Sequence, residues 1–302
     1  MIEWPINDDI TLSALRSANK ILVSSGASII EINAVRRAFS AIKGGGLAAS
    51  APNCDQITLI ISDVPTGQER NVASGPTLSP PDDAPDPRDV VARYGLDSQL
   101  PQSILRAISN ASPSKATSRL SRKHFVLLDN DDALEAAAAA ARQRGFKVEI
   151  AKDISDQPVD EGCRLLVERM QALRAQHGGA DIVGVISGGE FACPVKGDGI
   201  GGRNLETALR VAMEAENKWT SEDFVALCVG TDGVDGNSWA AGAIVDNTTV
   251  ERAGAVDLNP RDFLDRSDSF SFFEALDDAI ITGPTGTNVR DLRILLTAKG
   301  DA

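Results

Sequence analysis

The chain has 302 residues and a net charge of −13; 42% of its residues are hydrophobic, 24% are charged and 4% are aromatic. This composition is typical of a globular protein, and the length allows two domains. The acidic excess and the lack of a basic stripe argue against nucleic-acid binding. A site for anionic substrates would therefore have to supply its own positive charge.

The N-terminal sequence has no basic segment followed by an apolar core of signal length, and no apolar run approaches about 18 residues. We therefore expect a cytoplasmic protein without a membrane partner. The four cysteines form no C-x-x-C pair and fit no zinc spacing, so we interpret them as buried thiols. They are Cys54, Cys163, Cys193 and Cys228.

The first part of the chain predicts two helices and a strand. Apolar residues at helical spacing predict helix over residues 11–41, with a break at the segment SSGAS and an end at the glycines of 43–46. The apolar run ITLII at 57–61 predicts a buried parallel strand, and Asp63 follows its C-terminal end. Residues 79–87 are rich in proline and aspartate and predict a surface loop.

From residue 124 onward, predicted strands and helices alternate. This order predicts an α/β protein with mostly parallel sheets. The predicted strands are residues 124–129, 146–150, 181–187 and 223–229, and the predicted helices are residues 131–145, 158–176 and 203–216.

Three glycine-rich loops lie at predicted strand ends or helix starts. They are SGGE (187–190) with KGDGIGGRN (196–204), GTDGVDG (230–236) and TGPTGTN (282–288). Together they predict a site at which backbone N–H groups face an anion. Each loop taken alone is equally well explained as a tight turn.

Gly197, Gly199 and Gly202 match the pattern G-x-G-x-x-G before a predicted helix. In a dinucleotide site this motif follows the first strand directly, and an acidic residue ends the next strand. Here the preceding strand ends near Ser187, and Asp223 begins the next strand instead of ending it. The context therefore argues against dinucleotide binding, and no Walker motif is present.

Few cationic residues lie near these loops: Lys43, Lys196, Arg203, Arg36 and Arg37. Arg203 begins a predicted helix after two glycines, so its guanidinium and the helix N-terminus could bind one anion together. A solvated arginine at a helix start is the alternative.

The carboxylates of interest are Asp63, Asp232 and Asp235. Asp63 and Asp232 each follow a predicted strand, where a carboxylate can bind Mg²⁺ or accept a proton in phosphoryl transfer. Turn or capping chemistry is the alternative for each. His124 and His177 have no partner motif.

Several long strings resemble the glycerate 2-kinase family, whose members carry a MOFRL C-terminal domain. GASIIEINAVRRAFSAIKGGGLA (26–48), ITLIISDV (57–64) and ASGPT (73–77) are similar to its N-terminal domain. SGGE, KGDGIGGRNLETAL, GTDGVDG with AGAIVD (241–246), and TGPTGTNVRDL (282–292) are similar to its C-terminal domain.

The resemblance implies an α/β fold of two domains with the active site in the cleft between them. An incomplete Rossmann-like parallel-sheet domain would span residues 1–177, and a smaller α/β MOFRL domain would span residues 178–296. The implied cofactors are ATP and Mg²⁺, with D-glycerate as the acceptor and 2-phosphoglycerate as the product. A homodimer is compatible with the resemblance.

The resemblance also implies residue roles. Arg203 would steady the substrate or the transferred phosphate, Asp63 and Asp232 are candidate bases, and Asp232 and Asp235 are candidate magnesium ligands. The implied substrate- or nucleotide-binding residues are Asn33, Arg36, Lys43, Ser187, Gly188, Gly189, Glu190, Lys196, Gly201, Gly202, Asn204, Thr231, Gly283, Thr285 and Asn288.

The chain departs from the family pattern in three ways. Asp198 stands where family members usually have lysine, and the segment 62–67 lacks the second acid of S-D-V-x-G-D. The family's G-K-A and S-G-G-x-S segments, expected before Met1, are missing, so the first sheet should expose apolar edges. Besides a kinase, a hydroxypyruvate reductase and a non-catalytic remnant that binds ligand remain as hypotheses.

Overall fold

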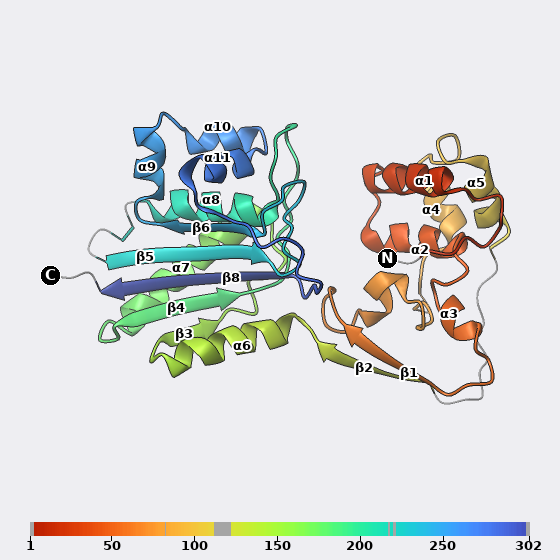
Figure 1. The fold of residues 1–302 in the computed structure, drawn as a ribbon, viewed down its shortest axis with the longest axis horizontal. Helices are drawn as coiled ribbons and strands as arrows, with labels where there is room; N and C mark the ends of the chain where they lie inside the picture. Colours follow the sequence, from red (N-terminus) through yellow and green to blue (C-terminus); the bar gives the residue numbers. More distant parts are fainter. Residues whose placement is uncertain (1–2, 82, 112–121, 217, 220–221, 300–302) are drawn as a thin grey trace. The chain divides into compact units, whose positions relative to one another are not determined.

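The computed structural model describes residues 3–81, 83–111, 122–216, 218–219 and 222–299. By its internal contacts the chain forms two compact units. Unit 1 comprises Met1–Ile60 and Thr66–Leu127, and unit 2 comprises Ile61–Pro65 and Leu128–Ala302 (Figure 1). This division falls some way before the domain boundary that the resemblance places at residue 177. The reason is packing, because residues 128–177 form a helix, a strand and a second helix that pack in unit 2.

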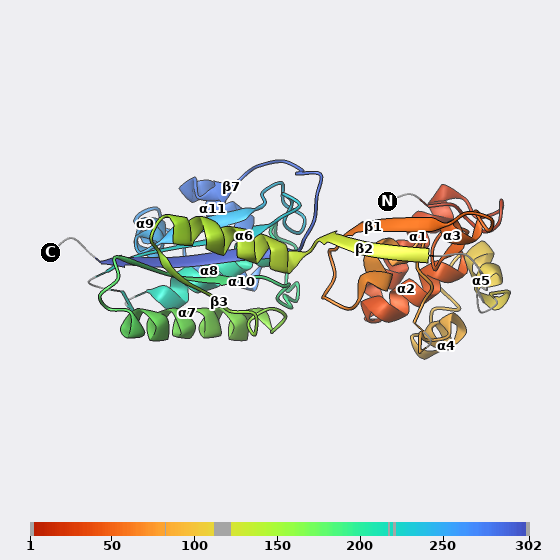
Figure 2. The same ribbon diagram turned by 90° about the horizontal axis from the view of Figure 1, so that it is seen from below.

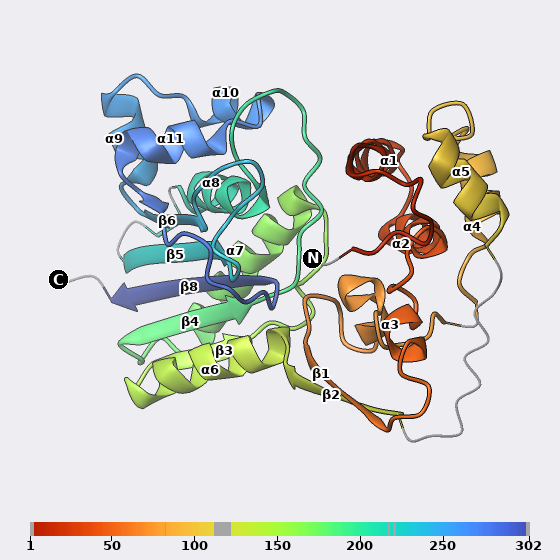
Figure 3. The same cartoon turned by 45° about the vertical axis from the view of Figure 1, so that its right-hand side comes forward.

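Unit 1 is mainly helical, and Figure 3 shows α1, α2, α4 and α5 gathered around one core. Its elements are α1 (Leu12–Ser24), α2 (Ile29–Ala38), α3 (Gly46–Ala49), the 3₁₀ helix η1 (Glu69–Ser74), α4 (Pro87–Arg93) and α5 (Gln102–Ser109). The predicted break between the first two helices is confirmed. Ser28 begins α2 with a capping box to Glu31, which satisfies free backbone N–H groups.

Strands β1 (Gln56–Ile61) and β2 (Arg122–Leu128) pair as a two-stranded sheet. The predicted strand at 57–61 exists, but the prediction that it is buried is wrong. Ile57, Leu59 and Ile61 are exposed, and only Ile60 is buried.

Unit 2 is built on a six-stranded sheet in the order β3-β4-β8-β5-β6-β7 (Figure 1). The strands are β3 (Lys147–Ile150), β4 (Ile182–Ser187), β5 (Glu222–Gly230), β6 (Gly242–Asp246), β7 (Ala279–Ile280) and β8 (Asp291–Lys299). The helices are α6 (Asn130–Gln143), α7 (Val159–Gln176), α8 (Arg203–Ala215), α9 (Thr249–Ala255), α10 (Pro260–Asp265) and α11 (Ser269–Leu276).

Helices cover both faces of this sheet, as Figure 2 shows for α6 and α7. Side chains alternate along a strand, so neighbouring residues belong to different cores. Val183 and Val185 of β4 pack in the main core with α7 and α8, whereas Ile186 packs with Leu134 of α6. The near-continuous apolar sequence of β4 follows from burial on both faces.

The α/β class is confirmed, but the expectation of mostly parallel strands is wrong for this sheet. Only β3 and β4 are parallel, and every other pairing is antiparallel. The sequence reading missed β8, which lies between β4 and β5. Because β8 runs antiparallel to both, its first residues lie beside the C-terminal ends of its neighbours. The register pairs Arg293 with Ser187 and Asp291 with Gly230. The segments SGGE, GTDGVDG and TGPTGTN therefore meet at one edge.

Candidate functional site

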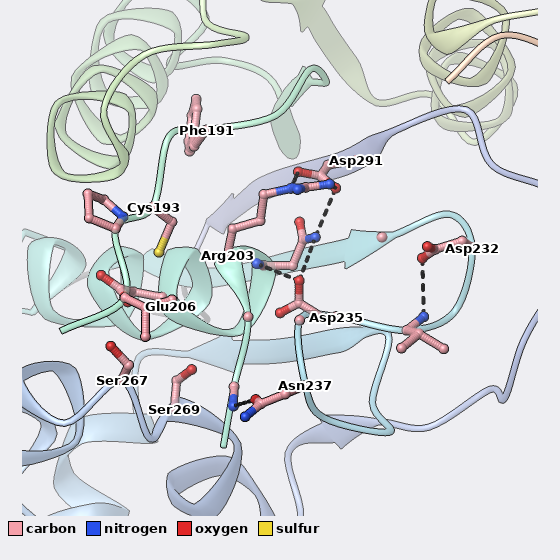
Figure 4. Close-up of a pocket in the computed structure, with 18 of the residues that line it drawn as sticks. Phe191, Cys193, Arg203, Glu206, Asp232, Asp235, Asn237, Ser267, Ser269 and Asp291 are labelled. Carbon is pink, nitrogen blue, oxygen red and sulfur yellow. Dashed lines mark hydrogen bonds and ion pairs between the residues drawn. The ribbon is translucent and has the colours of Figure 1, made fainter. Parts of the chain in front are cut away.

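A cavity of about 640 Å³ lies in unit 2 next to the start of α8 (Figure 4). Four segments contribute to its lining: parts of residues 191–206, 230–237, 267–269 and 288–291. A volume of this size suits a ligand larger than a three-carbon acid. The predicted site residues in the lining are Gly201, Gly202, Arg203, Asn204, Asp232, Asp235 and Asn288.

The N-terminus of α8 is occupied by a carboxylate of the protein itself. One oxygen of Asp235 accepts the backbone N–H and the Nδ2–H of Asn204, both at 3.1 Å, and the other accepts the N–H of Leu205 at 2.8 Å. Burial raises the pKa of Asp235 to about 6, while these N–H donors oppose the rise. The helix start that the sequence offered as an anion site is thus capped by Asp235.

Arg203 is held by two carboxylates. Its Nε lies 2.7 Å from one oxygen of the buried Asp291, and its Nη2 lies 3.2 Å from the other oxygen and 3.1 Å from Glu190. Burial lowers the pKa of Arg203, but the hydrogen bonds and charge of Asp291 outweigh this and raise it overall. Its side chain stays 36% exposed, so the guanidinium can still contact a ligand.

Glu190 lies among charges of both signs. Burial raises its pKa, Arg203 and Arg290 lower it, and Asp291 and Asp63 add to the rise. Asp63 belongs to the short segment Ile61–Pro65 that packs with unit 2. The structure thus brings both Asp63 and Arg203 within electrostatic reach of Glu190.

The G-x-G-x-x-G glycines have a packing explanation. A Cβ on Gly197 would lie 2.6 Å from the carbonyl oxygen of Arg266, and one on Gly199 would lie 2.5 Å from the Cβ of Asp268. A Cβ on Gly202 would lie 2.4 Å from the Cγ of Asp235. These glycines allow the loop before α8 to lie close to residues 266–268 and to Asp235. Close packing therefore explains the G-x-G-x-x-G pattern without a bound dinucleotide.

The other two glycine-rich loops are tied together by Thr231 and Thr285. The hydroxyl of Thr231 donates to the carbonyl of Arg290 at 2.7 Å, and that of Thr285 donates to the carbonyl of Thr231 at 2.7 Å. Asn130, the first residue of α6, connects the SGGE loop to the same place. It accepts the N–H of Gly189 at 2.8 Å and donates to the carbonyl of Asp291 at 2.9 Å.

Several predicted residues of unit 2 lie outside the cavity lining. Ser187 is fully buried and donates to the carbonyl of Ile154 at 2.7 Å. The carbonyl of Gly188 accepts a hydrogen bond from the guanidinium of Arg293. Lys196 is exposed, and its backbone N–H donates to Ser267. Thr285 and Gly283 belong to the loop that Thr231 holds in place.

Asn33, Arg36 and Lys43 belong to unit 1, apart from the residues of this cavity. Lys43 is buried and forms an ion pair with Glu3. The side-chain oxygen of Asn33 accepts the hydroxyl of Ser74 at 3.0 Å and a more distant N–H of Arg36 at 3.5 Å. These residues form a polar group of their own in unit 1.

The candidate magnesium ligands differ in availability. Both oxygens of Asp235 already accept N–H groups, so a metal bound there would compete with the capping of α8. One oxygen of Asp232 accepts the N–H of Val234 at 3.2 Å, and the other oxygen has no hydrogen-bond partner among the residues that the structure describes. Within the part of the chain that the structure describes, no group of three or more acidic, histidine or cysteine side chains could hold a metal. A magnesium ion bound at Asp232 would need further ligands, such as phosphate oxygens.

Sequence reasoning missed Asp291, Arg290 and Asn130. Asp291 and Arg290 follow the TGPTGTN loop directly, but their importance depends on β8 lying between β4 and β5. Asn130 reads as an ordinary helix start. The cysteine prediction holds for Cys163 and Cys228 and is wrong for Cys54, which is exposed.

Sequence profiles of two families match the chain: the MOFRL family over residues 183–291, and a domain of unknown function, DUF4147, over residues 1–109. An Agrobacterium vitis protein, provisionally labelled hydroxypyruvate reductase, is 37% identical over 95% of this chain and 74% of its own length. The D-glycerate 2-kinase of Thermotoga maritima is 33% identical over 97% of this chain and 69% of its own length.

A crystal structure of glycerate kinase from Thermotoga maritima superposes with a TM-score of 0.79 at 33% identity. The match covers 98% of this chain and 69% of that one. The chain belongs to the glycerate kinase family. Its members are enzymes. The similarity of this chain to them extends over nearly the whole sequence. Every helix in the described ranges is too short or too polar to cross a membrane.

Proposed function

We propose that this protein transfers the γ-phosphoryl group of ATP to the 2-hydroxyl of D-glycerate, giving 2-phosphoglycerate and ADP. The capping of α8 by Asp235 is the observation that favours a kinase over a reductase. In a reductase the pyrophosphate of the dinucleotide would bind at this helix N-terminus, which a carboxylate occupies here. The Thermotoga maritima relative named D-glycerate 2-kinase aligns with nearly all of this chain.

In this mechanism the protein supplies positioning, charge and a proton acceptor. A carboxylate, Asp63 or Asp232, takes the proton of the 2-hydroxyl as its oxygen bonds to the γ-phosphorus, and ADP leaves with the electrons of the broken bond. Arg203, oriented by Asp291, stabilises the charge on the transferred group. Magnesium would be held by Asp232 and phosphate oxygens and would neutralise phosphate charge.

The proposal also includes the domain boundary, the cellular location and the partners of the enzyme. The two family profiles leave residues 110–182 between them, so a boundary at residue 177 is compatible with two inherited modules. Use of ATP implies a cytoplasmic setting and small-molecule partners.

Hydroxypyruvate reduction is the second candidate, and the label on the Agrobacterium vitis relative favours it. It requires a nicotinamide site. The glycines of the G-x-G-x-x-G pattern are explained by their contacts with Arg266, Asp268 and Asp235. This leaves the reductase without a recognisable cofactor motif.

The test is ATP- and magnesium-dependent phosphorylation of D-glycerate, with 2- and 3-phosphoglycerate quantified separately. Arg203→Lys keeps the charge but loses the two-point contact with Asp291, so we expect turnover to fall at least about tenfold. Arg144→Gln, at an exposed arginine in unit 2, is the control and should keep wild-type turnover. Asp63→Asn should lower turnover at saturating magnesium if Asp63 is the base. A loss in Asp232→Asn that added magnesium restores would mark Asp232 as a metal ligand and not as the base.

Two outcomes would contradict the proposal. Oxidation of a nicotinamide cofactor with hydroxypyruvate, without phosphorylation of glycerate, would favour the reductase. Absence of both activities in a chain that still binds ADP would favour the non-catalytic hypothesis.

Wild-type turnover in Arg203→Lys would remove Arg203 from the mechanism.

A further inference from the structure

Arg290 has a backbone conformation that is rare for its residue type. Its φ is +72°, in the left-handed region, where a non-glycine residue is strained. Neighbouring loops hold it there. Its carbonyl accepts both the N–H and the hydroxyl of Thr231, and its N–H donates to the side chain of Asn288 at 2.9 Å. Strain maintained by several contacts is typical of a functional position.

The guanidinium of Arg290 is only partly satisfied by the protein. The residue is 7% exposed and lines the cavity, and its Nη2 pairs with Asp156. Among the described residues its buried Nε has no hydrogen-bond partner. A buried, unpaired donor on a charged group is costly, so an oxyanion that accepts this hydrogen bond would be bound favourably.

A second guanidinium and a carboxylate lie nearby. Arg203 binds Glu190 at 3.1 Å, and Arg290 also acts electrostatically on Glu190. The carboxylate of Glu190 is thus attracted by both arginines. It is nevertheless about one-third exposed, so it can move away without opening a core. The two residues also share a partner, because the backbone N–H of Glu190 donates at 3.1 Å to the Asp156 oxygen that pairs with Arg290. Glu190 thus supplies the negative charge that an oxyanion ligand of these arginines would supply.

We propose that Arg290 and Arg203 form a two-arginine oxyanion site on the rim of this cavity, and that Glu190 occupies the site when no ligand is bound. The ligand group is a phosphoryl group of the nucleotide or product, or the carboxylate of the three-carbon acid. This inference rests on the proposed function for the identity of its ligands but not for the existence of the site.

The test is calorimetric titration of the full chain with inorganic phosphate, ADP and D-glycerate at fixed ionic strength. In Arg290→Gln, the affinity for the occupying ligand should fall at least about tenfold, as expected for the loss of charged hydrogen bonds. Arg144→Gln removes the same charge at an exposed position of unit 2 and should leave the affinity unchanged. In Glu190→Gln, the affinity should rise several-fold, because a competing anion is removed.

Each result has one meaning. A loss confined to phosphate and ADP supports a phosphoryl site, and a loss confined to D-glycerate supports a carboxylate site. Unchanged affinities in Arg290→Gln, weaker binding in Glu190→Gln, or no binding of any of the three by the wild type would overturn the proposal. If Arg290→Gln does not fold, the ligand affinities of Glu190→Gln and Arg290→Lys test the proposal instead. Binding that depends on Arg290 in a chain without kinase activity would refute the proposed function and keep the site.

Discussion

Asp235 shows how one buried carboxylate can replace a ligand. It is 3% exposed and satisfies the first N–H groups of α8. Within the described parts of the chain, the carboxyl group is held by hydrogen bonds and has no salt bridge, and burial is the main cause of its raised pKa. Its protonation state therefore contributes to stability, apart from any role in catalysis.

We predict a pH-dependent contribution of Asp235 to stability. Its pKa is about 6 in the folded protein, against an ordinary value of 3.8, so the folded state binds this proton more tightly than the unfolded state. The contribution is present below about pH 4 and is lost as the pH rises through 6. Between these values the free energy of unfolding of the wild type, relative to Asp235→Asn, should fall by up to about 3 kcal/mol.

Urea unfolding of both proteins at several pH values measures this difference. Asp265→Asn, at an exposed carboxylate in the same unit, is the control and should follow the wild-type profile. Parallel profiles for the wild type and Asp235→Asn would mean that Asp235 titrates normally in the folded protein.

At the scale of elements, loop contacts fix the start of α8. The glycine loop before the helix lies against the segment before α11, and the Asp235 loop covers the helix N-terminus. The hydroxyl groups of Thr231 and Thr285 connect the loop after β5 to the loop before β8 at the same end of the sheet. The cavity exists because these loops are held by one another.

Gly202→Ala should destabilise the protein by about 1–3 kcal/mol, because its Cβ would lie 2.4 Å from a buried side chain that must move. Gly254, inside α9, is the matched control, since a Cβ there meets nothing within 4 Å. Gly254→Ala should stabilise the protein by about 0.4–1 kcal/mol. Chemical denaturation measures both, and a Gly202→Ala protein as stable as the wild type would show that the contact with Asp235 does not constrain position 202.

At the scale of the whole molecule, apolar side chains of the β1–β2 sheet remain uncovered in the described chain. Ile57 is 70% exposed and Leu59 is 62% exposed. An exposed strand of this kind pairs readily with another chain.

We therefore predict concentration-dependent self-association through this sheet. Leu59→Lys should shift the protein toward the monomer in sedimentation velocity, because a charge cannot be buried in such a contact. Val256→Lys, at a solitary exposed valine after α9, should leave the association unchanged. A wild-type chain that stays monomeric over the accessible concentration range would contradict the prediction.

The sequence by itself determined the family, the α/β class and most of the helices and strands before residue 230. These follow from local periodicity, capping residues and long motif strings, which are properties of neighbouring residues. It also placed Arg203 and Asp232 in the glycine-rich loops that together predict an anion site.

Only the tertiary structure decided what those residues contact. The insertion of β8 between β4 and β5 places Asp291 against Arg203 and brings Arg290 to the cavity. The position of Asp235 against the start of α8 makes it a helix cap. Strand order and burial depend on pairings between residues far apart in the chain. The periodicity of a single segment does not indicate which segment it pairs with.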